Sequence, residues 1–211
     1  GTADLRILHI SDMHMIPGQQ KKIDFMHSLA ALEPDLVMNT GDNLSHVDGM
    51  GPLLEALDPL MHFPGVFVPG SNCYFAPVFK NPARYLWQPR TPQMIEEGSR
   101  VALPIERMHD AFESRGWTGL VNRYDTLNLK GLRLEFSGVD DPHLRYDEHP
   151  GFAPGAFDEG EEPSVRIGVA HAPYMRTLHR FVQDGAQAIF AGHTHGGQVC
   201  LPGGHALVSN C

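Results

Sequence analysis

The chain has 211 residues, of which 42% are hydrophobic and 19% charged, as in an ordinary globular protein with a sizeable core. It carries 16 basic and 25 acidic residues, and this net charge of −9 argues against nucleic acid as the main partner, which would need a basic face. A small phosphorylated substrate stays compatible with the charge, because bound cations reverse the field locally. We expect a single domain over residues 1–211, with trimming at both ends left open.

Cysteine usage favours a cytoplasmic protein. The three cysteines, Cys73, Cys200 and Cys211, have no recognisable zinc or disulfide spacing, so we expect reduced thiols, with a Cys73–Cys200 or Cys200–Cys211 bridge as the alternative. No apolar run is long enough to span a membrane and no signal peptide is present, although a removed N-terminal leader or membrane anchor stays open. The oligomeric state is not predicted.

Strands and helices alternate in the first third of the chain. Buried strands are predicted at 5–10, 35–38 and 66–68, with helices at 21–32 and 52–61 between them. We interpret the apolar stripe of the first helix as core packing. The stripe consists of Ile23, Phe25, Met26, Leu29, Ala30 and Leu32.

Residues 75–103 change character, because prolines punctuate aromatic and basic side chains there. Two interpretations stay open. These side chains could contact a substrate phosphate and ring, or the segment could be a solvated cover loop, which we favour slightly. The candidate contacts are Lys80, Arg84, Tyr85, Trp87 and Arg90. A helix is predicted next, at 104–115.

The second half is rich in strands. Predicted here are a hairpin over 127–136 turning at Lys130-Gly131, strands at 165–170 and 187–191, and a helix at 175–181. Asp140, Asp141 and His143 follow the hairpin and could lie near a site, but turn chemistry explains an Asp-Asp-Pro sequence equally well. The acidic stretch 147–163 is expected to be a surface loop.

Residue types that bind metals follow four of the predicted strands. They are the Asp12-Met13-His14 sequence, Gly41-Asp42, His171, and the sequence Gly192-His193-Thr194-His195-Gly196-Gly197. The first three are weak signals alone, because turn aspartates and structural histidines are common. The last is sharper, because flanking glycines let both imidazoles aim at one place. Carboxylates and imidazoles gathered at strand ends are what a binuclear metal site needs.

These motifs, in this order, resemble the calcineurin-like metallophosphoesterases over nearly the whole chain. The resemblance implies an α/β fold, a β-sandwich flanked by helices in αββα layers. It also implies two divalent or trivalent metal ions drawn from Mn, Fe, Zn and Mg. Asp12, His14 and His195 would hold the first metal, Asp42 would bridge the two, and His171, His193 and an asparagine would hold the second. Asn43 beside Asp42 is expected to orient the site.

One block departs from the family pattern of Gly-Asn-His. The chain has Gly70-Ser71-Asn72-Cys73-Tyr74 there, so either Ser71 or Asn72 takes the place of the ligand asparagine. We favour Asn72, because an amide carbonyl is the better metal donor. The histidine, which in the family assists the leaving group, is missing. Its absence could slow cleavage by about 10²–10⁴-fold.

Cys73 then has three interpretations: a buried bystander, which we favour, a replacement proton donor, or a thiolate ligand. His46 is the nearest sequence candidate to replace the missing acid, although an ordinary surface histidine is the better interpretation. The catalytic candidates are therefore Asp42, Asn72 and Cys73.

These patterns predict a metal-dependent hydrolase in which a metal-bridging hydroxide attacks a phosphodiester, a phosphomonoester or a pyrophosphate. The alternative is a catalytically impaired metal-binding scaffold of the same fold with a protein partner. A structural domain with coincidental ligands is a remote third.

Overall fold

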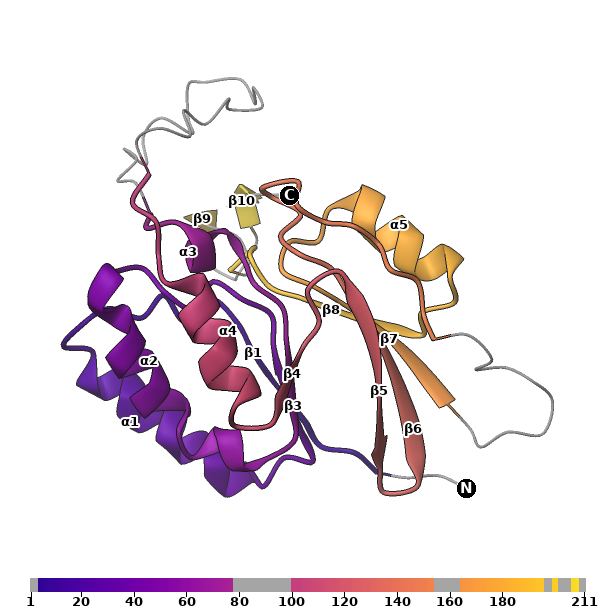
Figure 1. Ribbon diagram of the computed structural model, residues 1–211, viewed down its shortest axis with the longest axis horizontal. Coiled ribbons are helices and arrows are strands. Elements are labelled where there is room, and N and C mark those ends of the chain that lie inside the picture. The colour runs from indigo at the N-terminus through magenta and orange to yellow at the C-terminus, as the bar shows by residue number, and fades with distance from the viewer. Residues whose placement is uncertain (1–3, 78–99, 154–163, 196–198, 201–205, 209–211) are drawn as a thin grey trace.

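The computed structural model describes residues 4–77, 100–153, 164–195, 199–200 and 206–208. The molecule is layered helix, sheet, sheet, helix (Figure 1), with α1, α2 and α4 on one side and α5 on the other. This arrangement confirms the predicted αββα class.

The first sheet consists of four parallel strands in chain order. They are β1 (Ile7–Ile10), β2 (Leu36–Asn39), β3 (Gly65–Phe67) and β4 (Trp117–Gly119). Its outer face is covered by the helices α1 (Gln20–Ser28), α2 (Met50–Leu57) and α4 (Ile105–Glu113). Side chains alternate along β2, so Val37 joins the core under the helices while Leu36 and Met38 join the core between the sheets. Both faces are buried, as expected for a parallel sheet.

The second sheet mixes one antiparallel pair with two parallel pairs. Its order is β5 (Arg123–Leu129), β6 (Leu132–Gly138), β7 (Ser164–Ala170) and β8 (Ala188–Ala191). β5 and β6 form the predicted hairpin, which turns through left-handed Lys130 (φ 51°) and Gly131 (φ 74°).

The helix α5 (Met175–Gln183) covers the outer face of the second sheet. Its Phe181 packs directly on Gly168 of β7, where an added Cβ would lie 2.7 Å from the ring. On the other face of β7, Ile167 and Val169 pack against β2 and β3 across the central core. The two faces of β7 thus pack against α5 on one side and against the first sheet on the other.

Some expectations for the helices were wrong in detail. The helix predicted over 21–32 ends at Ser28 and continues as a 3-10 turn, η1 (Leu29–Leu32). Phe25 and Leu32 are 60% and 49% exposed, so their assignment to the core was wrong. The apolar stripe of this segment is wider than the part of the helix surface that packs against the sheet, so its edge residues remain exposed.

Several short elements had not been predicted as such. They are the 3-10 turns η2 (Val47–Gly49) and η3 (Leu60–His62), the single-turn helix α3 (Ser71–Tyr74), and the strands β4 (Trp117–Gly119) and β9 (Val199–Cys200). β9 pairs with β10 (Ala206–Val208), whose sequence is itself strand-like. The helix predicted over 52–61 is thus divided between α2 and η3.

The segment 75–103 begins and ends side by side, because Phe75 pairs with Ala102 and the Leu103 amide donates to the Tyr74 carbonyl at 2.8 Å. The basic and aromatic candidates in its interior, Lys80, Arg84, Tyr85, Trp87 and Arg90, lie outside the described residues, as do positions 154–163. Within the described part of the chain, no helix combines the length and apolar character needed to cross a membrane.

Candidate metal centre

The predicted ligands converge at the carboxyl ends of the parallel strands. The loops that follow β1 and β2 are tied together by backbone hydrogen bonds, from the Asp12 amide to the Gly41 carbonyl and from the His14 amide to the Asp42 carbonyl, both 2.9 Å. Parallel neighbours end at the same edge of a sheet, so two motifs far apart in the sequence become one surface.

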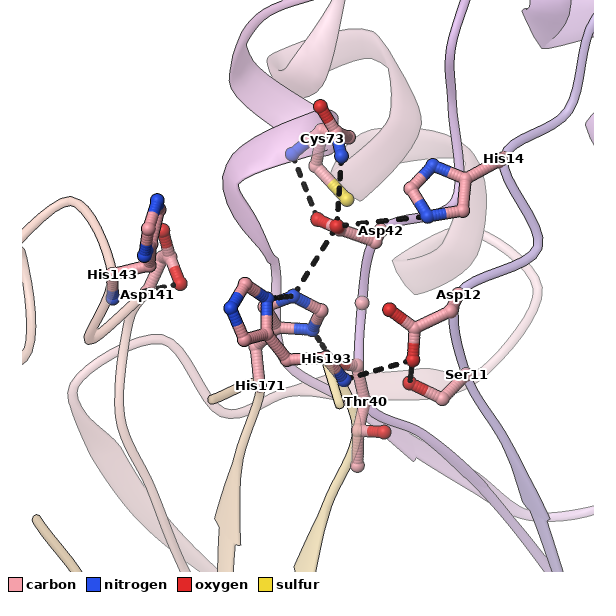
Figure 2. Close-up of polar contacts among 12 residues, drawn as sticks. Ser11, Asp12, His14, Thr40, Asp42, Cys73, Asp141, His143, His171 and His193 are labelled. Carbon is pink, nitrogen blue, oxygen red and sulfur yellow. Dashed lines mark hydrogen bonds and ion pairs between the residues drawn. The ribbon is translucent and has the colours of Figure 1, made fainter. Parts of the chain in front are cut away.

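Six of the seven predicted metal ligands form two groups of three, and Figure 2 labels five of these six, all but His195. In each group, one ligand atom from every residue lies within 4.8 Å of the others. The outer group, named for its partial exposure, consists of Asp12, His14 and His195. The inner group, which is buried, consists of Asp42, His171 and His193. Each group offers one carboxylate and two imidazoles, a donor set that suits Zn, Mn or Fe ions.

Five of these six residues have left-handed backbone conformations. The φ angles are 55° at Asp12, 45° at His14, 51° at Asp42, 69° at His193 and 50° at His195. Such angles are uncommon outside glycine and cost free energy, and they cluster at functional sites. The sharp turns aim the side chains inward. Single-residue conformation of this kind is not readable from the sequence.

In the inner group, a hydrogen bond fixes the proton of one imidazole. His171 Nδ1 lies 2.7 Å from the Thr40 carbonyl, which can only accept, so the proton of the neutral ring is on Nδ1 and the lone pair is on Nε2. That nitrogen lies 3.3 Å from Asp42 Oδ2 and 3.2 Å from His193 Nδ1. His171 Nε2, Asp42 Oδ2 and His193 Nδ1 could therefore bind one cation together. A hydrogen bond on the other ring nitrogen, like that to Thr40, orients a histidine for metal binding.

Charges around Asp42 explain the titration of the inner group. Burial alone would raise the pKa of Asp42, but His171 and His14 beside it hold that pKa well below its usual range. Burial would lower the pKa of His171, but the Asp42 carboxylate raises it to about 9, so a cation that binds at Nε2 would displace a proton from the ring. Burial and the neighbouring His171 lower the pKa of His193 to about 4. Asp42 therefore stays ionised inside the protein, as a cation ligand must.

The outer group is held through Asp12. Its Oδ2 accepts from Ser11 Oγ at 2.6 Å and from the His193 amide at 2.9 Å. Its Oδ1 is buried without a hydrogen bond and lies 3.2 Å from His195 Nε2. A buried carboxylate oxygen without a donor is costly, and a cation would satisfy it. His14 is oriented by a 2.9 Å contact between Nδ1 and Ser45 Oγ.

The turn that lacks the family histidine forms α3. Asn72 lies against Asp42, to which its amide N–H donates at 2.7 Å and its side-chain Nδ2 at 2.9 Å, leaving the side-chain oxygen as the possible metal donor. Gly70 permits this approach, because a Cβ there would overlap Asp42 Oδ1 and the His171 ring. The structure thus brings Asn72 to the site, and its role as a ligand stays a prediction.

Cys73 turns away into the core under the helices, with no exposed surface. Its sulfur accepts from the Asn43 amide at 3.5 Å, and burial, with the Asp42 charge nearby, raises the pKa of the thiol to about 12. This placement supports the interpretation as a buried bystander. Asn43 is itself buried and reaches Cys73 rather than a ligand side chain. His46 caps η2 by accepting from the Asp48 amide at 3.1 Å, a structural role.

The loop after β6 contributes residues that the sequence had left undecided. Asp140 accepts from the Tyr74 hydroxyl at 2.7 Å, which ties α3 to the second sheet. Asp141 is buried, and desolvation raises its pKa to about 7. His143 packs on His193, with 5.1 Å between ring centroids. Thr40, Ser45 and Ser11, which orient ligands, were missed in the sequence because a lone hydroxyl or carbonyl carries no motif.

Comparison with known proteins identifies the family. The family described as calcineurin-like phosphoesterase matches residues 5–197. The chain is similar to the uncharacterized protein YpbG of Bacillus subtilis (strain 168), with 27% identity over 203 residues that cover 94% of this chain and 64% of the relative. The chain thus spans less than two thirds of that relative. Among solved structures, the protein TT1561 of Thermus thermophilus is similar at a TM-score of 0.48 with 13% identity, covering 89% of this chain and 81% of that one.

Proposed function

The chain belongs to the calcineurin-like phosphoesterase family, and on this basis we propose that it hydrolyses phosphoesters at a binuclear metal centre. The observation that supports this proposal most directly is the pair of adjacent three-donor groups, which approach each other where Asp42 Oδ2 lies 3.8 Å from His14 Nε2. Two bound cations would supply charge that stabilises the phosphoryl oxygens and would lower the pKa of a water molecule, so that hydroxide attacks phosphorus.

The protein's own residues have separable roles in this proposal. Asp42 lies between the groups, because its Oδ2 is 3.3 Å from His171 Nε2 and 3.8 Å from His14 Nε2, so it would bridge the cations. Asn72 would complete the inner ligand set and hold Asp42 in place. The substrate would be a small phosphodiester, phosphomonoester or pyrophosphate. We further propose a cytoplasmic location, supported by the free thiol of Cys73.

Hydrolysis of bis-p-nitrophenyl phosphate tests the proposal. The protein would be stripped with chelator, refilled with Mn²⁺, and its metal content counted beside the rate. Two metal ions per chain with turnover that chelator abolishes is the expected result. Two metal ions without turnover on this diester, on p-nitrophenyl phosphate or on a pyrophosphate would instead favour the metal-binding scaffold, which the absence of a histidine in α3 motivates. Protein that binds no metal would overturn both.

A further inference from the structure

His143 stands beside the candidate centre without belonging to either ligand group. Its ring and the ring of His193 are 5.1 Å apart at 39°, and the residue is exposed. Figure 2 shows it next to the inner group, on the side away from Asp12. An exposed imidazole against a metal ligand lies where a substrate would reach the cations.

The loop that carries His143 is fixed from several directions. The buried Asp141 carboxylate accepts from the amides of His143 at 3.1 Å and Leu144 at 3.0 Å. His143 Nδ1 lies 2.9 Å from the Tyr174 hydroxyl, and the two rings stack at 6.3 Å. Arg176 donates to the carbonyl of Pro142 at 2.7 Å. The orientation of the imidazole is therefore built into the fold, as a functional side chain requires.

In the neighbouring turn, α3, three of the four residues have side chains that are already engaged or buried, and none of the four is a histidine. The Asn72 amide donates to Asp42, the Tyr74 hydroxyl donates to Asp140, and Cys73 is buried. Ester cleavage leaves negative charge on the departing oxygen, which a positioned donor stabilises. Of these side chains and His143, only the histidine combines exposure, a ring N–H and contact with a ligand residue.

We propose that His143 contacts the leaving-group oxygen of the substrate and that Tyr174 is its positioning residue. This inference rests on the hydrolase function proposed above. Water loses its first proton to the solvent, and the resulting hydroxide forms the new bond to phosphorus, while the bond to the leaving oxygen breaks and that oxygen keeps the electron pair. The imidazole N–H donates a hydrogen bond to this oxygen, which ends as the alcohol after taking the second proton of the water.

Two esters that differ only in the leaving group test the proposal. The probes are methyl p-nitrophenyl phosphate, whose leaving group is stable as an anion, and methyl phenyl phosphate, whose leaving group is not. His143→Ala should lower kcat/KM for the phenyl ester by about 10²-fold and for the p-nitrophenyl ester by about threefold. Tyr174→Phe should also lower kcat/KM more for the phenyl ester than for the p-nitrophenyl ester, but both losses should be smaller than those of His143→Ala.

Metal content and a distant histidine provide the controls. His143→Ala should keep the metal content of the parent protein, and His179→Ala, an exposed change on α5, should alter neither ester. Equal losses on both esters, or loss of metal from His143→Ala, would overturn the inference while the hydrolase proposal stands. A parent protein that cleaves none of these diesters, nor p-nitrophenyl phosphate, nor a pyrophosphate, would overturn the inference together with the hydrolase proposal.

Discussion

The inner and outer groups use the same residue types in different surroundings. In the inner group, Asp42, His171 and His193 are 3%, 0% and 7% exposed. In the outer group, the side chains of His14 and His195 are 25% and 44% exposed. The sequence predicts which residue types form the two groups. How deeply each group is buried depends on the folded chain.

The difference in burial should become a difference in cation exchange. The inner group has a ring oriented by a backbone carbonyl, at His171, and a carboxylate held by two donors from Asn72. The outer group depends on His195, on an exposed turn. Charges in water-excluded surroundings interact more strongly than exposed ones. We therefore expect the inner cation to bind tighter and leave later.

Asp42→Asn should have the largest effect, because it changes the residue between both groups. The amide cannot bridge two cations, so both metal ions should be lost and hydrolysis of bis-p-nitrophenyl phosphate should fall by about 10³-fold or more. Metal analysis and steady-state kinetics measure this. Asp48→Asn is the matched control, since that carboxylate is exposed in the same loop. A variant that kept two metal ions would contradict the bridging role.

His195→Ala should separate the groups. After dialysis the variant should keep about one metal ion per chain, and its activity should fall by about 10–100-fold. In the parent protein, timed chelation should release the metal in two phases, the faster one missing from this variant. His62→Ala, an exposed change on η3, should behave as the parent. Loss of both metal ions from His195→Ala would show that the inner group does not hold a cation alone.

The candidate ligand positions could be proposed from the sequence because each motif is local and follows a strand. Asp12, Asp42, His171 and His193 follow strands, so parallel pairing brings Asp12 near Asp42 and His171 near His193. Packing of the two sheets against each other then brings these two pairs together. The layer order was predicted as what the family resemblance implies, and the βαβ pattern of the first half agrees with it.

What the sequence did not predict depends on contacts between distant residues. The exposure of Phe25 follows from the width of the sheet face under α1, and β4 is a three-residue strand that gains its identity from pairing with β3. The hydrogen bond of His171 to Thr40 joins positions 131 residues apart. The left-handed backbone conformations at these residues cannot be predicted from residue type, since Asp and His also occur in ordinary turns.

Cys73→Ala should have the smallest effect on activity. It tests whether the buried inner group depends only on Asp42, His171 and His193 or also on the neighbouring thiol. The thiol packs in the core, so its removal should cost about 1–2 kcal/mol of unfolding free energy and change kcat by about twofold or less. In the folded parent, thiol reagents at pH 8 should label Cys73 slowly, because a pKa raised from 9.0 to about 12 lowers the thiolate fraction by about 10³-fold. Peptide mapping distinguishes it from Cys200 and Cys211. If Cys73 were a thiolate ligand, Cys73→Ala would lose the inner cation and most of the activity. That result would mean that the inner group binds its cation mainly through sulfur rather than through Asp42 and two imidazoles.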